Sequence, residues 1–462
     1  MNKRNIHVKN MENIFYPKSV AILGANRVVG TVPYDLLDNV LKSDFQGVVF
    51  PVSPKEPFIK GVKTYKYVLD IPDPVDLAIL VYAGSVCHLA LDQCGKKGVK
   101  AAIIISAGFK ETGAEGLKRE LELKEIADKY GISFIGPNCL GVINTDPLSN
   151  LNASFARKMP REGNIAFLSQ SGALCTAVLD YAQGKHIGFS KFVSFGNKAD
   201  ISEIDLLYYL KDDPKTKVIL LYLEEISDGI GLMNAAKEII ADTGKPILIL
   251  KSGRTTEGAA AAASHTGSLA GSDQICDAAL RQAGMIRCNT IEEMFNLAIA
   301  MAYQPLPENN RVAIITNAGG PGVLATDSAI QENLRLAKFS DETTAIFKKT
   351  LPKTANIKNP VDVIGDARAD RYNIAITSAL KDENVDSVFV ILTPQSMTDI
   401  ETIAEEIVSV SKESNKPIYT SFMGEADVAS GIDILQQNRI PHYILPESMS
   451  HASARAFKFS EY

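Results

Sequence analysis

The sequence predicts an α/β protein made of three doubly wound units with parallel sheets. Short runs rich in Val and Ile alternate with helical patterns along the chain, which is typical of strands covered on both faces. The length of 462 residues suits about three domains. Two of the three units also repeat the same segments in the same order, which indicates a duplication.

The first predicted unit, residues 1–148, has the strand and helix alternation of a nucleotide-binding domain. A helical pattern fills Ala114–Tyr130 and is followed at once by an apolar run. The apolar runs of this unit predict strands at Ser19–Gly24, Gly47–Val52, Val75–Val81, Lys100–Ser106 and Ile132–Gly136.

The second and third units, residues 149–305 and 306–462, look like copies of each other. Four segments match in order: IAFLSQSGALCTAV with VAIITNAGGPGVLAT, GNKADI with KNPVDV, LYLEE with ILTPQ, and GKPILILKSGR with NKPIYTSFMGE. Kept order favours duplication over chance likeness. The spacing grows along the chain, so the later copy carries insertions, and the boundary is expected at Gln304–Asn310. Strands are expected at Asn164–Leu168, Phe189–Ser194, Val218–Leu223, Pro246–Lys251, Val312–Thr316, Ser387–Thr393 and Pro417–Phe422.

The composition excludes several classes of protein. With 46% hydrophobic and 22% charged residues and a net charge of −6, the chain lacks the basic surplus that nucleic acid requires. No apolar run reaches the roughly 18 residues of a membrane span, and the first residues lack a signal-peptide core. The six cysteines are scattered, as in a reducing compartment. We therefore expect a soluble cytoplasmic protein that acts on small molecules.

The first strand-to-helix turn, Gly24-Ala-Asn-Arg-Val-Val-Gly30, resembles a dinucleotide fingerprint with Asn26 in place of the second glycine. NAD binding would need an acidic residue after the second strand, but that strand ends in Pro51-Val-Ser-Pro-Lys55. A lysine suits phosphate groups, so the pattern favours coenzyme A over NAD. The alternative is a turn that is only structural. Further crevice loops are Val81–Ser85, Ser106–Phe109 and Gly136–Cys139.

Two strand-to-helix turns have the small residues of an anion site. Ser169-Gln-Ser-Gly-Ala173 follows a buried strand, and Asn317-Ala-Gly-Gly-Pro-Gly322 repeats the pattern in the later copy. Backbone N–H groups at a helix start, aided by the helix dipole, receive anions. We expect the two helix starts to converge on one phosphoryl group, and tight turns needed only for packing are the alternative.

The stretch Gly253–Ser272 reads GRTTEGAAAAASHTGSLAGS and holds one histidine, His265. It has no apolar stripe, so it predicts a flexible loop whose imidazole is reached, modified and released. A loop histidine without a task is the alternative. Glu224 and Glu225 end an apolar strand, and a carboxylate beside a histidine fixes its tautomer and raises its basicity. A solvated strand end is the alternative for either glutamate.

Taken in order, SQSGA, GNKADI, YLEE, GRTTEGAAAAASHTGSLAGS and NAGGPG resemble the α subunit of archaeal ADP-forming acetyl-CoA synthetases, which are acetate–CoA ligases related to succinyl-CoA synthetase. The resemblance implies a Rossmann-like CoA-binding domain followed by two flavodoxin-like domains. It also implies the reversible conversion of acyl-CoA, ADP and phosphate to the free acid, ATP and CoA. That reaction passes through an acyl phosphate and a phosphohistidine.

The same resemblance assigns residues to roles. It makes His265 the phosphorylated histidine and Glu224 its supporting carboxylate, and it names no metal ligand in this chain. It places the phosphoryl group on Ser169, Gln170, Ser171, Gly172, Gly319 and Gly320. It places coenzyme A on loops that contain Gly24, Asn26, Arg27, Thr31, Pro51, Ser53, Lys55, Val81, Ser106 and Asn138.

The resemblance further implies that ADP or ATP, with Mg²⁺, binds an ATP-grasp β subunit on another chain, in an α₂β₂ heterotetramer. On that account this chain alone stops at the phosphohistidine. The sequence leaves two alternatives, a CoA-binding regulatory or acyltransferase-associated protein without ligase activity and a non-enzymatic CoA sensor. It does not indicate which acyl group is used.

Overall fold

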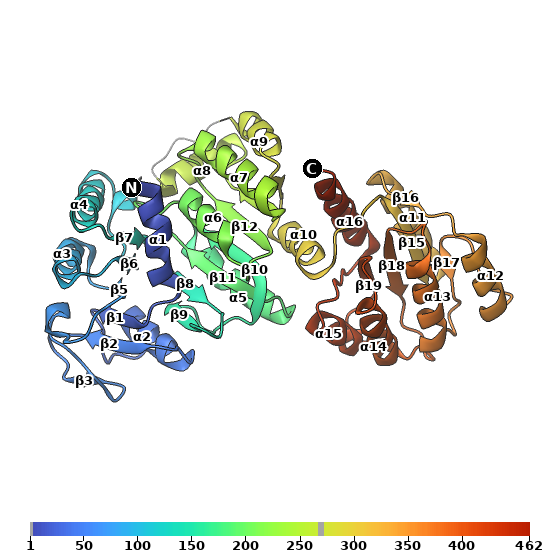
Figure 1. Ribbon diagram of the computed structural model, residues 1–462, viewed down its shortest axis with the longest axis horizontal. Coiled ribbons are helices and arrows are strands. Elements are labelled where there is room, and N and C mark those ends of the chain that lie inside the picture. Colours follow the sequence, from blue (N-terminus) through green and yellow to red (C-terminus); the bar gives the residue numbers. More distant parts are fainter. Residues whose placement is uncertain (1–2, 267–271) are drawn as a thin grey trace. The chain divides into compact units, whose positions relative to one another are not determined.

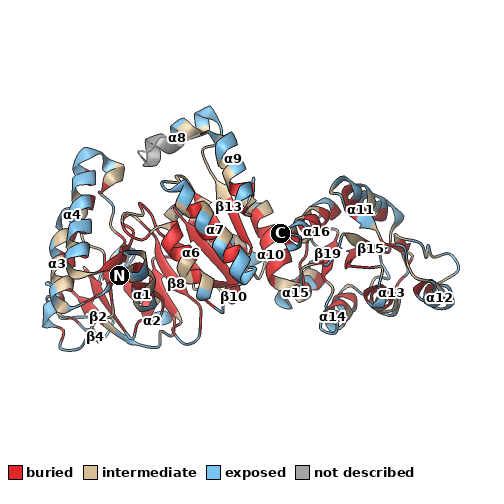
Figure 2. Ribbon diagram, turned by 45° about the horizontal axis from the view of Figure 1, so that its top comes forward, coloured by how far each residue is buried: buried red, intermediate tan, exposed pale blue. Residues whose placement is uncertain are grey.

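The computed structural model describes residues 3–266 and 272–462, except for the side chains of residues 262–266. It divides into two compact units, Met1–Gly184 with Gly188–Cys288, and Lys185–Ile187 with Asn289–Tyr462. Buried strands form the interior of each unit, and the flanking helices expose their outer faces (Figure 1, Figure 2). Of the helices described, none is long and apolar enough to cross a bilayer.

The first sheet of unit 1 is parallel and has the order β2-β1-β5-β6-β7. Its direction of growth reverses between β1 and β5, and ligands of open α/β sheets bind at such a switch point. The helix predicted at Ala114–Tyr130 is confirmed, and each predicted strand is present within two residues. The elements are α1 Lys3–Phe15, β1 Ser19–Leu23, α2 Val32–Lys42, β2 Val48–Val52, β3 Phe58–Ile59, β4 Val62–Lys63, β5 Leu77–Leu80, α3 Cys87–Lys97, β6 Ala101–Ile104, α4 Ala114–Tyr130 and β7 Ser133–Ile135.

The second sheet has the order β14-β13-β12-β10-β11-β8-β9. The four strands predicted for this sheet are present as β10, β11, β12 and β13, but β8, β9 and the short parallel strand β14 were not predicted. β8 and β9 have only 4 residues each, too few to form a marked apolar run, yet both are buried and pair antiparallel. The elements are β8 Gly141–Asn144, β9 Leu151–Ser154, β10 Glu162–Ser169, α5 Gly172–Gly184, β11 Phe189–Ser194, α6 Glu203–Asp212, β12 Val218–Leu223, α7 Gly229–Thr243, β13 Ile247–Lys251, α8 Thr256–Thr266, α9 Asp273–Gln282 and β14 Ile286–Arg287.

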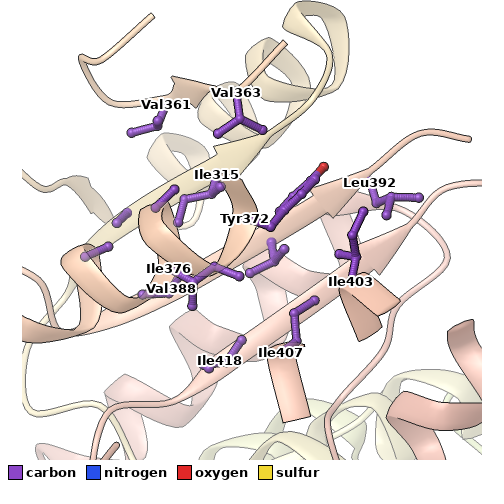
Figure 3. Close-up of a cluster of buried hydrophobic side chains, with 14 of the residues drawn as sticks. Ile315, Val361, Val363, Tyr372, Ile376, Val388, Leu392, Ile403, Ile407 and Ile418 are labelled. Atoms are coloured by element: carbon purple, nitrogen blue, oxygen red, sulfur yellow. The ribbon is translucent and has the colours of Figure 1, made fainter. Parts of the chain in front are cut away.

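Unit 2 holds a parallel sheet in the order β16-β15-β18-β19, with β17 paired to the other end of β15. Its core packs Tyr372 and Ile376 of α13 and Ile403 of α14 against Val388 and Ile418 of the strands (Figure 3). The elements are α10 Ile291–Tyr303, β15 Arg311–Thr316, α11 Gly319–Gln331, β16 Arg335–Leu336, α12 Asp341–Thr350, β17 Val361–Asp362, α13 Ala369–Lys381, β18 Ser387–Leu392, α14 Ile400–Ser411, β19 Ile418–Phe422, α15 Ala429–Gln437 and α16 Pro446–Ser460.

The two predicted copies share their strand order. β11-β10-β12-β13 in the second sheet corresponds to β16-β15-β18-β19 in the third. The place of β11 is shared by two short strands: β16 pairs with Arg311 and Val312, and β17 pairs with Ile315 and Thr316. Helix α12 lies between these strands in the chain. An insertion that includes α12 therefore separates the two short strands in the later copy.

The small-residue run was predicted as a loop, and that prediction was wrong for Thr256–Thr266, which form α8. Alanine has the highest helix propensity of all residues. The negative charge of Glu257 lies in the first turn, where the positive end of the helix dipole stabilises it. The first turns expose Glu257 and Ala260. The absence of an apolar stripe therefore indicated an unburied helix instead of a loop. The backbone of His265 belongs to α8, while its side chain lies outside the described residues.

A buried histidine of helix α1 forms ion pairs with two aspartates near and within α6. His7 is 5% exposed, with Nε2 3.3 Å from Asp200 Oδ1 and Nδ1 3.4 Å from Asp205 Oδ1. Lys3 lies 3.1 Å from Asp200, and Arg4 lies 3.8 Å from Asp205. Burial opposes the charged imidazole, but the two carboxylates outweigh it and raise the pKa of His7 to about 9.

We predict that His7→Gln destabilises the protein at pH 7 by on the order of 3 kcal/mol, the equivalent of the raised pKa. The folded-state pKa lies above the unfolded value of about 6.5. The contribution is therefore complete below pH 6.5 and disappears as the pH rises through about 9. Denaturant unfolding at pH 7 and pH 10 measures it.

His88→Gln on α3 is the control. His88 also lies near a carboxylate, 4.0 Å from Glu122, but neither side chain is buried, so little stability depends on this pair. A stability difference for His7→Gln that stays the same at both pH values would contradict the buried ion pair.

Candidate functional site

A cavity of about 670 Å³ opens in unit 1 at the carboxyl edge of the first sheet. Val81, Ser106 and Asn138, predicted to contact coenzyme A, line one part of it. The segment Gln170–Gly172, predicted to hold phosphate, and the predicted catalytic Glu224 line another. Three separately predicted parts of the site therefore meet in one cavity.

The remaining residues predicted for coenzyme A lie outside the lining of this cavity, at the ends of β1 and β2. Gly24 has φ +101°, and a Cβ there would lie 3.1 Å from the ring of Tyr82, which lines the cavity. Pro51 and Ser53 are buried, whereas Lys55 is exposed. The turn at the end of β1 thus needs a glycine so that it can approach the cavity wall.

Asn26 and Arg27 are engaged by neighbouring residues. Asn26 Oδ1 accepts hydrogen bonds from the N–H of Val28 at 2.9 Å and the hydroxyl of Thr31 at 3.0 Å. Arg27 donates to the carbonyl of Phe58 at 2.9 Å and pairs with Glu56 at 2.9 Å. Asn26 and Thr31 therefore shape the turn before α2, and Arg27 joins it to the β3–β4 hairpin.

The turn before α5 is closed by Ser169. Its buried hydroxyl donates to the carbonyl of Ser171 at 2.9 Å and accepts from the N–H of Ser171 at 3.1 Å. Thr316 does the same for Ala318 in unit 2, at 2.9 and 3.1 Å. Ser169 does not line the cavity, so its hydroxyl serves the turn, whereas Ser171 and Gly172 face the cavity.

Gln170 joins this turn to the end of β12. Its Oε1 accepts the N–H groups of Glu224 at 2.9 Å and Glu225 at 3.1 Å. Asn317 repeats the joint in unit 2, where its Oδ1 accepts the N–H of Thr393 at 2.9 Å. By these hydrogen bonds Glu224 is equivalent to Thr393. The match of LYLEE with ILTPQ had aligned Glu224 with Pro394, one residue further along. The later copy therefore keeps the joint but has no carboxylate at this point.

The two adjacent glutamates have different surroundings. Glu224 lines the cavity, whereas the Glu225 carboxylate accepts from the Ser227 hydroxyl at 3.0 Å and lies 3.7 Å from Lys110 Nζ. Lys251 donates to the carbonyl of Glu224 at 2.8 Å, and Lys198 donates to the carbonyl of Glu225 at 2.8 Å. The backbone holds both residues firmly, and Glu224 is the one placed at the cavity.

The cavity residues that the sequence analysis missed include Lys110, Gly196 and Asn197. Asn197 donates to Glu111 at 2.7 Å and to Glu120 at 2.9 Å, and burial raises the pKa of Glu120. Gly196 has φ +51°, and a Cβ there would lie 2.3 Å from two carbonyl oxygens of the loop before β8. The signal was present, because GNKADI was recognised as a repeated segment, although not as part of a site.

Gly319 and Gly320 begin α11 in unit 2, whereas Ser171 and Gly172 belong to unit 1. The expected convergence of the two helix starts on one phosphoryl group therefore stays a prediction. Among the side chains of residues 3–261 and 272–462, no group of three or more His, Cys, Asp or Glu is arranged to hold a metal ion.

The cavity combines three chemical features. The start of α5 offers N–H groups and the positive end of a helix dipole, which stabilise an anion. Glu224 supplies a carboxylate for orienting or exchanging a proton. Leu140, Ile105 and Phe155 supply apolar wall, which lowers the local dielectric and strengthens both effects.

Three family models match the chain in succession. The model described as a CoA binding domain matches residues 18–145, the succinyl-CoA ligase like flavodoxin domain matches 162–301, and the Ligase-CoA domain matches 312–456. These matches confirm the predicted fold class. The first match also agrees with the preference for coenzyme A over NAD.

Curated relatives match nearly the whole chain. The α subunit of acetate–CoA ligase (ADP-forming) II of Pyrococcus furiosus is 44% identical over 96% of both chains. The acetate–CoA ligase (ADP-forming) of Methanocaldococcus jannaschii is 47% identical over 97% of this chain and 63% of its own length. The 4-hydroxybutyrate–CoA ligase (ADP-forming) of Nitrosopumilus maritimus is 41% identical over 97% of this chain. The chain spans less than two thirds of the last two relatives, 63% and 64%.

A solved structure agrees with these relatives. The dinucleotide-forming acetyl-coenzyme A synthetase 1 of Ca. Korarchaeum cryptofilum, in complex with phosphate and ADP, superposes with a TM-score of 0.92 and 37% identity over 98% of this chain and 97% of its own. The family resemblance drawn from the motifs is thereby confirmed. The chain belongs to the family of ADP-forming acetate–CoA ligases.

Proposed function

We propose that this chain is the α subunit of an ADP-forming acid–CoA ligase. It converts acyl-CoA, phosphate and ADP to the free acid, CoA and ATP, reversibly, through an acyl phosphate and a phosphohistidine on His265. The observation that carries the proposal is the cavity in which crevice loops of the CoA-binding domain, the start of α5 and Glu224 come together.

In the first step a phosphate oxygen attacks the thioester carbonyl, the C–S bond breaks, and CoA leaves as the thiol after taking up a proton. The carbonyl oxygen carries negative charge in the transition state, and the N–H groups at the start of α5, at Gly172, stabilise it. The apolar wall excludes water, which would otherwise hydrolyse the acyl phosphate.

In the second step an imidazole nitrogen of His265 attacks phosphorus, and the acid leaves as its carboxylate. Glu224 orients the imidazole and keeps the attacking nitrogen unprotonated. The chain path supports this role, because Ser252 donates its N–H to the carbonyl of Leu223 at 3.0 Å. The segment that leads into α8 therefore departs next to Glu224.

The third step transfers the phosphoryl group from His265 to ADP, with Mg²⁺, on an ATP-grasp β subunit in an α₂β₂ assembly. Two observations support a separate partner. Relatives called subunit alpha are covered over 96% and 98% of their length by this chain. The relatives without that designation extend well beyond the match. The two relatives that are 47% and 41% identical over 97% of this chain are named for acetate and 4-hydroxybutyrate, so we propose a small organic acid as the substrate.

We predict that the chain becomes labelled by ³²P-phosphate in the presence of acetyl-CoA and Mg²⁺ without ADP. His265→Asn abolishes the label because no imidazole is left to accept the phosphoryl group, and coenzyme A binding, measured by calorimetry, remains. His88→Asn is the control and keeps the label.

Phosphohistidine is labile in acid, so the label is lost on acid treatment. Acid-stable label, or label that survives in His265→Asn, contradicts the assignment. A chain that binds coenzyme A without any labelling indicates instead a CoA-binding regulatory or acyltransferase-associated protein.

We predict that Glu224→Gln slows labelling of His265 by about 10²- to 10⁴-fold, the range of a positioned acid or base. Glu225→Gln slows it far less, because the Glu225 carboxylate is engaged by Ser227 and Lys110. Single-turnover labelling rates of the two variants give the comparison. Equal and small losses would show that neither carboxylate serves the histidine.

A further inference from the structure

Lys110 lines the same cavity and has no role in the proposal above. It follows the loop Ser106–Phe109 after β6 and begins the short 3₁₀ helix Lys110–Thr112, η3. Helix α8, which includes the backbone of His265, contacts η3. The lysine therefore lies between the loops of the CoA-binding domain and the segment that bears the histidine.

The negative charges around the cavity favour a cation at this point. Phosphate carries roughly 1.5 negative charges at neutral pH, and it must approach the carboxylate of Glu224, with Glu225 adjacent in the chain. Repulsion between such charges is strong where the dielectric is low. Among the described residues that line the cavity, Lys110 is the basic one.

Two other lysines near the end of β12 are committed to structural contacts. Lys198 donates to the Glu203 carboxylate at 3.0 and 3.1 Å and to the carbonyl of Glu225 at 2.8 Å. Lys251 donates to the carbonyl of Glu224 at 2.8 Å and to the carbonyl of Ser252 at 2.5 Å. Neither ammonium can turn to a ligand without breaking these bonds.

Lys110 is held differently. Its Nζ lies 3.7 Å from Glu225 Oε2, which is an ion pair but longer than a hydrogen bond, and its side chain is 22% exposed. The backbone at its root is fixed, because Glu111 Oε1 accepts the N–H groups of Gly108 at 2.6 Å and Phe109 at 3.1 Å. A Cβ at Gly116 would lie 1.7 Å from the carbonyl oxygen of Phe109, so α4 packs directly beneath this loop. A rigid root therefore carries an ammonium that can move from Glu225 toward an anion.

We propose that Lys110 binds the inorganic phosphate that attacks the thioester, and that it stays with the phosphoryl group until His265 takes it. The inference rests on the proposed function for its reaction. No proton or electron is exchanged with Lys110, which acts as a fixed positive charge and hydrogen-bond donor. Its pairing with Glu225 holds the ammonium at the cavity while phosphate is absent.

The test compares Lys110→Met and Lys110→Arg with the wild-type chain. Phosphate binding is measured by calorimetry with inorganic phosphate in the presence of saturating coenzyme A, and His265 labelling is measured over a range of ³²P-phosphate concentrations. We expect Lys110→Met to raise the dissociation constant for phosphate by about tenfold or more, the effect of one lost charge-assisted hydrogen bond. The phosphate concentration that gives half-maximal labelling should rise by the same factor. The affinity for coenzyme A stays unchanged, and Lys110→Arg retains most of the phosphate affinity.

Two matched variants separate binding from structure. Lys118→Met removes an exposed lysine of α4 and should leave phosphate affinity unchanged. Glu225→Gln removes the ion-pair partner, and it should not weaken phosphate binding if Lys110 binds the anion itself. A loss of phosphate affinity in Glu225→Gln equal to that in Lys110→Met would overturn the proposal, because Lys110 would then act only by holding Glu225.

Unchanged phosphate affinity in Lys110→Met, or a wild-type chain that binds no phosphate, would also overturn it. The two proposals fail separately. If the wild-type chain binds phosphate through Lys110 but His265 is never labelled, the phosphate site stands and the proposed ligase reaction falls.

Discussion

The candidate site depends on one side-chain link, in which Gln170 Oε1 accepts hydrogen bonds from two backbone N–H groups. These N–H groups belong to Glu224 and Glu225, which directly follow the last residue of β12, Leu223. Leaving a buried N–H without an acceptor costs about 1–3 kcal/mol, so this link sets the path of the chain. Since Gln170 also lies in the turn that begins α5, the carboxylate of Glu224 and the start of α5 are fixed beside each other.

Unit 2 contains an equivalent hydrogen bond at a strand end that has no carboxylate. Asn317 holds Thr393 as Gln170 holds Glu224, and Thr316 closes its turn as Ser169 does. The duplicated scaffold therefore tolerates a residue without charge at the strand end. Glu224 is not needed to build the turn, which favours a chemical role for the carboxylate in the first copy.

Regular elements could be predicted from the sequence because their apolar periodicity is local. Helix α4 and the strands β11 and β12 have the predicted bounds. The short strands β8 and β9 escaped prediction because their pairing, and not their composition, makes them strands. Helix α8 was not predicted because its run of alanines has no apolar face to bury. The helix propensity of alanine alone favours a helix there.

Site residues were predictable as loops but not as contacts. The sequence placed Val81, Ser106, Asn138 and Glu224 at strand ends, and these residues meet in the cavity. It could not show that Ser169 and Asn26 use their side chains within their own turns. Lys110 was missed because one lysine in a surface loop carries no signal until its neighbours in space are known.

The central claim is that a single cavity in unit 1 receives both the thioester end of acyl-CoA and the phosphate that attacks it. A crystal structure of this chain with coenzyme A tests that claim most directly. The account predicts that the thiol lies in the cavity between Gly172 and Glu224, with the rest of the cofactor along the ends of β1 and β2. Coenzyme A bound with its thiol outside this cavity would contradict the account.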